Sequence, residues 1–309
     1  MRRGLSALAA LVVVGVAAFW VATMPRGLPA AELAALGPGD AAKGETWFWA
    51  GGCAGCHAAA KAEGEERLKL GGGQALATPF GRFVVPNISS DPDDGIGTWS
   101  AGDLANAMLK GVTPGGQHLY PAFPYPSYAR MKPADVADLR AYLATLPAVS
   151  GRPPGHALRF PFSIRRGIGL WKLAFLRSGP VVAVDDGDPA VARGQYLVEG
   201  PGHCGECHTP RDFAGGLDLG RWLAGAPNPA GKGRVPNITP GDGGIGAWSA
   251  EDIAYFLETG FTPDYDSVGG SMVEVQANMA MLAPADRAAI AAYLKAVPPQ
   301  ASAGSAPGE

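Results

Sequence analysis

The chain is poor in cysteine, histidine and charge. Its 309 residues include four cysteines and five histidines, and only 17% are Asp, Glu, Lys or Arg. The net charge of -3 leaves no basic excess of the kind that a nucleic-acid-binding face requires, so we expect no nucleic-acid partner. Glycine and proline are abundant instead, with 45 and 28 copies, and hydrophobic residues make up 47%. This composition indicates small, loop-rich domains around a large apolar group, and the length predicts about two domains.

All four cysteines lie in two copies of one motif, Cys-x-x-Cys-His, at residues 53–57 and 204–208. Thiols three positions apart lie about one helical turn apart, so both can form thioethers with the vinyl groups on one edge of a haem. The histidine that follows, His57 or His208, is then held beneath the iron as the proximal ligand. The motifs therefore predict two covalently bound haems c, attached through Cys53, Cys56, Cys204 and Cys207.

A zinc site and a disulfide framework are the alternative uses of these cysteines. A structural zinc ion takes four ligands from paired Cys and His clusters, whereas each motif offers three, and haem attachment explains all three. Covalent haem attachment is completed outside the bacterial cytoplasm, so it also predicts an exported protein.

An uncharged run from Leu5 to Met24 follows Arg2 and Arg3. Twenty helical residues span about 30 Å, the thickness of the hydrocarbon core of a bilayer. The arginine pair predicts an N-terminus in the cytoplasm and a remainder on the periplasmic side of the bacterial inner membrane. Since a small-x-small cleavage site is lacking, we favour an uncleaved anchor, and a cleaved signal peptide stays the alternative.

The rest of the chain is an internal duplication. The haem motifs begin at positions 53 and 204, which are 151 residues apart, and Pro-Asn-Ile-[Ser/Thr] at 86–89 returns at 236–239. The segment Gly-Ile-Gly-x-Trp-Ser also occurs twice, beginning at Gly95 and Gly244. A repeat of this length indicates two copies of a whole domain.

Helix signals recur in both copies. Each copy has an N-cap serine followed three residues later by Asp, a C-cap glycine, and a proline that starts the last helix. These residues are Ser100 and Ser249, Gly111 and Gly260, and Pro133 and Pro284. We expect the last helix to cross the helix that precedes the haem motif, where Gly44 and Gly194 permit close approach.

We predict an all-α fold with long loops and an N-terminal transmembrane helix. The expected segments are an anchor or signal at 1–25, a linker at 26–39, a first domain at 40–149, an interdomain linker at 150–188, a second domain at 189–298 and a disordered tail at 299–309. Residues 58–85 are predicted to be loop. The interdomain linker contains an apolar, basic segment, which we interpret as a buttress between the domains; a helix that docks on a partner or on the membrane is the alternative.

The sequence resembles the membrane-associated, multi-haem cytochrome c subunits of bacterial periplasmic dehydrogenases, such as quinone-linked alcohol dehydrogenase and gluconate 2-dehydrogenase. The resemblance covers roughly residues 40–298 and rests on the repeated motifs, on Tyr120-Pro121-Ala122-Phe123-Pro124-Tyr125 and on Gly269-Gly270-Ser271-Met272. It implies two tandem class I-type cytochrome c domains. Two departures matter: several members carry a third haem domain, and some have Met where this chain has Phe123.

The resemblance implies an electron carrier without catalytic residues. Two haems would pass electrons from a periplasmic dehydrogenase, which could be a quinoprotein, a flavoprotein or a molybdoprotein, to the respiratory chain through a quinone, a cytochrome or an oxidase. A dihaem enzyme, such as a cytochrome c peroxidase or a thiosulfate-oxidising cytochrome, is the alternative. A peroxidase needs an open distal position and a nearby acid–base group.

Met131 and Met272 are the predicted distal iron ligands. After the first haem motif the first unit contains only Met108 and Met131, and Met108 matches a leucine in the repeat, as a core position would. Met131 lies just before the last helix, where such domains bring their distal ligand. Met272 follows the flexible Gly269-Gly270-Ser271 segment, and the resemblance implies it as well. His118 is the alternative ligand for the first haem.

Overall fold

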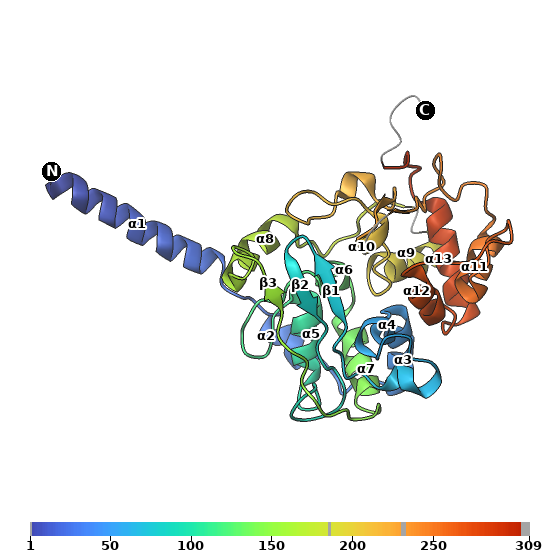
Figure 1. The fold of residues 1–309 in the computed structure, drawn as a ribbon, viewed down its shortest axis with the longest axis horizontal. Helices are drawn as coiled ribbons and strands as arrows, with labels where there is room; N and C mark the ends of the chain where they lie inside the picture. The colour runs from blue at the N-terminus through green and yellow to red at the C-terminus, as the bar shows by residue number, and fades with distance from the viewer. Residues whose placement is uncertain (1, 185–186, 230–232, 304–309) are drawn as a thin grey trace.

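The computed structural model describes residues 2–184, 187–229 and 233–303. Helix α1 (Arg2–Ala22) extends away from the body of the protein (Figure 1). Its Gly4–Ala22 stretch is long and apolar enough to cross a membrane, and none of that stretch is buried against protein. A short helix, α2 (Ala30–Ala34), leads into the body.

The first half of the body is built on two packed helices, α3 and α7. Its helices are α3 (Ala41–Ala50), α4 (Cys53–His57), α5 (Ala101–Lys110), α6 (Tyr125–Tyr128) and α7 (Pro133–Leu143). Gly44 permits the close packing of α3 on α7, because a Cβ atom there would lie 2.0 Å from the carbonyl oxygen of Asp138. The predicted crossing of these two helices is confirmed.

The second half repeats this arrangement with α9 and α13. Its helices are α9 (Pro189–Glu199), α10 (Gly205–His208), α11 (Ala250–Thr259), α12 (Met272–Met279) and α13 (Pro284–Ala296). A Cβ atom on Gly194 would lie 1.9 Å from the carbonyl oxygen of Ala289, so α9 and α13 approach as closely as their counterparts. One continuous core joins the halves, with Phe48 and Tyr293 among its fully buried members.

The predicted helix ends are confirmed in both halves. Ser100 and Ser249 form reciprocal capping boxes with the Asp residues three positions later. Gly111 and Gly260 end these helices with φ angles of 60° and 81°, in the left-handed region that suits glycine.

The all-α prediction is incomplete, because two small antiparallel sheets also form. Strands β1 (Ala75–Thr78), β2 (Gly81–Val84) and β3 (Ala157–Leu158) make one sheet, and β4 (Ala226–Pro227) pairs with β5 (Arg234–Val235) in the other. Residues 58–85 are therefore not all loop. The hairpin of β1 and β2 turns at residues 79–80, where the Thr78 hydroxyl donates to the Gly81 carbonyl. The third strand comes from the interdomain linker, a partner that no local pattern reveals.

Helix α8 (Ile168–Phe175) lies in the linker and contacts both halves of the body. The Lys172 ammonium donates to the Gly111 carbonyl at 2.6 Å, and the Trp171 indole N–H donates to the Ala214 carbonyl at 2.9 Å. These contacts are the ones that a buttress between the two halves would make.

The tail begins later than predicted. The Ala303 amide donates to the Ala224 carbonyl at 2.8 Å, and the Gln300 carbonyl accepts from the Asn237 side chain at 2.8 Å. Residues 300–303 are therefore held on the body, and the remainder of the predicted disordered tail lies outside the described residues.

Candidate functional site

The first Cys-x-x-Cys-His motif forms α4, a single turn that follows Gly52 in the left-handed conformation, with φ of 61°. Cys53 is partly buried and Cys56 is exposed, and neither is in a disulfide. The imidazole Nδ1 of His57 hydrogen-bonds with the carbonyl oxygen of Pro86 at 2.9 Å. This bond orients the ring and leaves Nε2 available for an iron atom.

The second motif has the same geometry. Cys204 caps α10, and the Nδ1 of His208 hydrogen-bonds with the carbonyl oxygen of Pro236 at 2.8 Å. Burial lowers the pKa of the His57 imidazole to about 4 and also lowers that of His208, although each carbonyl contact opposes the shift. Both rings are therefore neutral at neutral pH, which is the form that coordinates metal.

Each prolyl carbonyl is held in place by the asparagine that follows it. The Asn87 amide N–H donates to the Val149 carbonyl at 2.7 Å, and its oxygen accepts from the Ser89 backbone at 2.9 Å. Asn237 binds the Gln300 carbonyl and the Thr239 backbone in the same way. The Pro-Asn-Ile segments thus orient the proximal histidines. In the sequence these segments served only as evidence of the internal duplication. Their role could have been suspected, because a histidine that ligates iron needs a hydrogen-bond acceptor for its other ring nitrogen.

This donor set fits haem c and does not fit the alternatives. Within the described ranges, no three His, Cys, Asp or Glu side chains are arranged to hold a metal ion between them, as a zinc site would require. The four cysteines are free of disulfides. Two thiols on one turn beside a histidine whose Nδ1 is occupied are what thioether attachment and axial ligation need.

The two motifs face each other where the halves meet. The Glu206 carboxylate, inside the second motif, accepts from the Ser127 hydroxyl at 2.8 Å. On the other side Asn278 packs against Gly55 of the first motif and accepts from Arg67 at 3.0 Å. Figure 1 shows α12, which carries Asn278, beside α4 and α3.

This contact is approximately symmetric. Ser127 and Asn278 are 151 residues apart, as are Gly55 and Glu206, so equivalent positions of the repeat meet across the junction.

Both predicted distal ligands lie near this junction. Met131 is buried, and its Cγ would lie 3.7 Å from a Cβ atom on Gly200, just before the second motif. Met272 is partly buried at the start of α12, whose length packs against α3 and α4 of the first half. Ligation of iron by Met131 and Met272 stays a prediction.

His118 is engaged elsewhere. Its Nε2 hydrogen-bonds with the carbonyl oxygen of Thr23 at 2.8 Å, directly after α1, and its own carbonyl accepts from Arg165 at 2.9 Å. The structure thus gives His118 a role at the base of α1.

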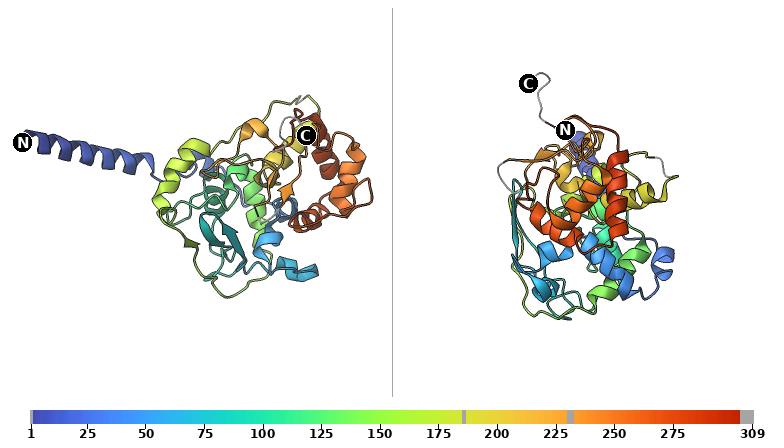
Figure 2. Two further views of the ribbon diagram at one scale, coloured as in Figure 1. Left: turned by 45° about the horizontal axis from the view of Figure 1, so that its top comes forward. Right: turned by 90° about the vertical axis from the view of Figure 1, so that its right-hand side faces the viewer.

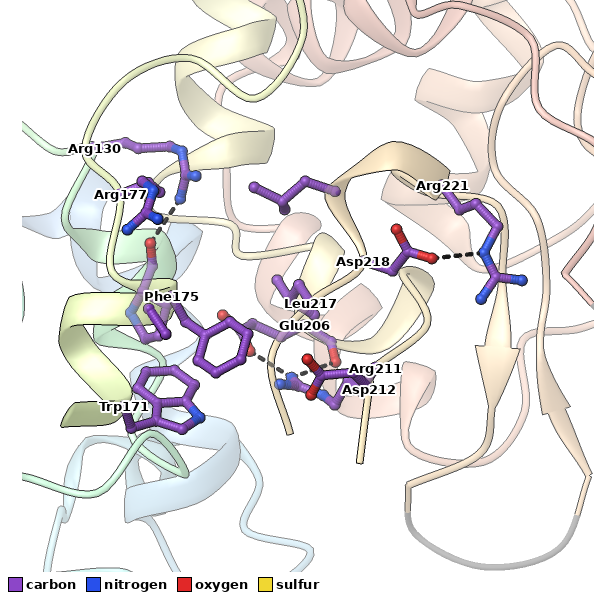
Figure 3. Close-up of a pocket in the computed structure, with 13 residues that line it drawn as sticks. Arg130, Trp171, Phe175, Arg177, Glu206, Arg211, Asp212, Leu217, Asp218 and Arg221 are labelled. Atoms are coloured by element: carbon purple, nitrogen blue, oxygen red, sulfur yellow. Dashed lines mark hydrogen bonds and ion pairs between the residues drawn. The ribbon is translucent and has the colours of Figure 1, made fainter. Parts of the chain in front are cut away.

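A cleft of about 510 Å³ opens beside the second motif (Figure 3). Figure 3 shows Glu206 and Arg211 of the second half opposite Trp171 and Phe175 of α8. Two of the four arginines that line the cleft are in ion pairs: Arg211 binds Glu206 at 2.5 Å, and Arg221 binds Asp218 at 2.8 Å. The other two, Arg130 and Arg177, donate to backbone carbonyls, so the cleft keeps positive charge and leaves this edge of the second motif accessible.

Comparisons with known proteins agree with this geometry. Residues 41–147 match the family model for cytochrome c. The chain is 54% identical to a diheme cytochrome c-type protein of Cereibacter sphaeroides, over 96% of this chain and 99% of that protein. It is 38% identical to the fructose dehydrogenase cytochrome subunit of Gluconobacter japonicus, over 82% of this chain and 51% of that protein.

It is also 34% identical to the cytochrome c subunit of the quinone alcohol dehydrogenase of Gluconobacter oxydans, over 80% of this chain and 52% of that subunit. The chain thus spans about half the length of these dehydrogenase subunits. The resemblance inferred from the motifs is confirmed.

Proposed function

The chain belongs to the dihaem c-type cytochromes and carries two covalently bound haems c, and from this premise we propose that it takes electrons from a periplasmic dehydrogenase and delivers them to the respiratory chain. The relatives named as cytochrome subunits of fructose, alcohol and gluconate dehydrogenases support the dehydrogenase as donor. The chain is an electron-transfer protein, and the dehydrogenase performs the substrate chemistry.

The observation that carries this function is the pair of facing haem motifs. A carrier with two centres needs them close together, so that an electron can pass within one chain. The Ser127–Glu206 bond and the packing of Asn278 on Gly55 hold the two motifs against each other from both sides.

The residues have distinct tasks. The bound haems supply reversible one-electron chemistry at iron. Cys53 and Cys56 anchor the first haem, and Cys204 and Cys207 anchor the second. The Pro86 and Pro236 carbonyls keep the proximal rings of His57 and His208 oriented. Met131 and Met272 are the proposed sixth ligands, which would raise the potentials.

We assign the two haems to two class I-type domains, residues 40–149 and 189–298. The matching helix pairs α3 with α7 and α9 with α13 support this division. Helix α1 is the proposed anchor in the bacterial inner membrane, which places the body in the periplasm. The donor is a quinoprotein, flavoprotein or molybdoprotein, and the acceptor a quinone, a cytochrome or an oxidase.

Purification from native membranes tests the function. The full chain, tagged at its C-terminus and extracted with mild detergent, should bring with it a dehydrogenase whose cofactor identifies its class. Adding that enzyme's substrate to the complex should reduce the haems, whereas the chain alone should not respond. Rapid hydrogen peroxide turnover by the chain alone would instead favour the dihaem enzyme.

A further inference from the structure

The base of α1 is fixed to the body by a joint of defined contacts. Thr23, the residue after α1, is fully buried. Its carbonyl binds His118, and its hydroxyl accepts from the Arg166 guanidinium at 2.9 Å. The same guanidinium lies 4.2 Å from the centre of the Trp20 ring. A Cβ atom on Gly169 would lie 2.6 Å from the Thr23 Cα, so α8 is in backbone contact with the end of α1.

This joint fixes the level of α8 relative to a membrane that α1 crosses. The 19 residues Gly4–Ala22 rise about 29 Å as a helix, close to the thickness of the hydrocarbon core. Thr23 then lies where the hydrocarbon ends and the headgroups begin. Figures 1 and 2 both place α8 beside the base of α1, at this same level.

An apolar surface continues from α8 into the segment that precedes it. Five large side chains there are exposed by between 44% and 80%: Phe160, Phe162, Ile164, Leu170 and Leu173. They follow one another on the segment 160–173, which we call the collar. Arg159 and Arg177 stand exposed at its two ends, as basic residues do beside anionic headgroups.

The side chains of α8 are distributed in the opposite way to those of a helix whose outer face meets water. Its lysine points inward, because the Lys172 ammonium donates to the Lys110 and Gly111 carbonyls at 2.7 and 2.6 Å. Its leucines point outward, with Leu170 exposed by 49% and Leu173 by 62%. A face of this kind matches an apolar surrounding.

We propose that the collar inserts into the headgroup–acyl boundary of the leaflet from which α1 emerges, so that the bilayer holds the protein at two places. The inference rests on the proposed anchoring by α1, and its occupant is lipid. With α1 alone the span and the body joined to it could tilt together in the bilayer; the collar is a second contact that restricts this tilt.

Site-specific fluorescence on the full, haem-loaded chain tests the collar. Because the native cysteines are used by the haems, Leu173→Cys provides a single thiol for an NBD fluorophore. The protein is inserted into vesicles of phosphatidylethanolamine and phosphatidylglycerol that include lipid with a doxyl quencher high on the acyl chain. We expect blue-shifted emission and strong quenching. The matched control is Tyr255→Cys on α11, a residue 55% exposed at the other end of the body, which should show neither effect.

Three other outcomes would overturn the collar. Equal emission from the two labelled sites, in protein that sediments with the vesicles, would overturn the collar and leave the anchor standing. Shielding of site 173 only after a partner protein is added would also overturn it and would make the surface a protein interface. Protein that stays in the supernatant would refute the anchor, and the collar with it.

Discussion

At the scale of single residues, the most informative ones bind no haem. Asn87 and Asn237 each hold a prolyl carbonyl in place, and that carbonyl fixes a proximal histidine. The haem motifs themselves could be predicted because cysteine spacing is a local property. The asparagines could not be given a role from the sequence, since the carbonyls to which they donate, those of Val149 and Gln300, lie 60 or more residues further along the chain.

Asn87→Ala should perturb the first haem alone. It removes bonds to Val149 and Ser89, so the Pro86 carbonyl loses its support, and we expect a loss of about 1–3 kcal/mol in unfolding free energy. Redox titration should show a shift in one midpoint potential. Asn237→Ala is the matched control and should shift the other potential. If either variant shifted both midpoint potentials, the asparagine would not act only on the proximal histidine of its own haem.

Replacing Met131 or Met272 with Ala tests the distal ligands. Each variant should abolish the low-spin methionine signature of one haem, including its weak band near the red end of the spectrum, and should lower that haem's potential. His118→Ala is the control, since the His118 ring binds Thr23 instead. Should Met131→Ala leave both haems unchanged while His118→Ala converts one to high spin, the first assignment is wrong.

At the scale of elements, local signals determine the helices but not their surroundings. Caps and first-turn prolines predicted the helix ends because these signals act within one turn. Strand β3 could not be predicted from local signals, because it comes from the linker, more than 70 residues after β2. The outward leucines of α8 were ambiguous for a related reason: whether they face protein, water or lipid depends on where α1 ends.

Gly194→Ala should destabilise the protein. Alanine usually stabilises a helix by up to about 1 kcal/mol relative to glycine. Here the new methyl group would lie 1.9 Å from the Ala289 carbonyl, so α9 and α13 must separate, and overpacking costs about 1–3 kcal/mol. Urea unfolding of the haem-loaded protein measures the change.

Gly102→Ala is the control for this substitution. Its Cβ would lie 3.2 Å from the end of the Leu33 side chain, which can move, and 3.6 Å from the Ser100 hydroxyl, an ordinary contact distance. We expect a neutral or slightly stabilising effect. If the two variants were destabilised equally, the close packing of α9 on α13 would not be the reason that glycine is needed at position 194.

At the scale of the whole molecule, the two halves meet through their haem motifs. The repeat predicted two similar units, but it gave no information on how they join, because Ser127 and Asn278 differ in type and α12 is twice the length of α6. The position of Glu206 at this junction places one carboxylate beside the second haem attachment site.

Glu206→Gln should raise the potential of the second haem by tens of millivolts. Removing a nearby negative charge destabilises the oxidised iron, and Arg211 would lose its ion-pair partner, which acts in the same direction. Glu251→Gln, on the exposed start of α11, makes the same change in net charge far from the junction and should leave both potentials unchanged. An unaltered second potential in Glu206→Gln would show that the carboxylate lies too far away to act on the iron.

The junction also has a consequence for the direction of electron flow. Contact through equivalent surfaces is the isologous arrangement of a homodimer, in which both subunits must carry the same residue at each position. One covalent chain is free of that constraint. It can carry Gly55 in the first motif and Glu206 at the equivalent position of the second, and likewise Ser127 in the first half and Asn278 in the second. Because both haems belong to one chain, their surroundings can differ and so can their reduction potentials. Electron transfer between them can then have a preferred direction, from one haem that accepts electrons from the donor to one that passes them on.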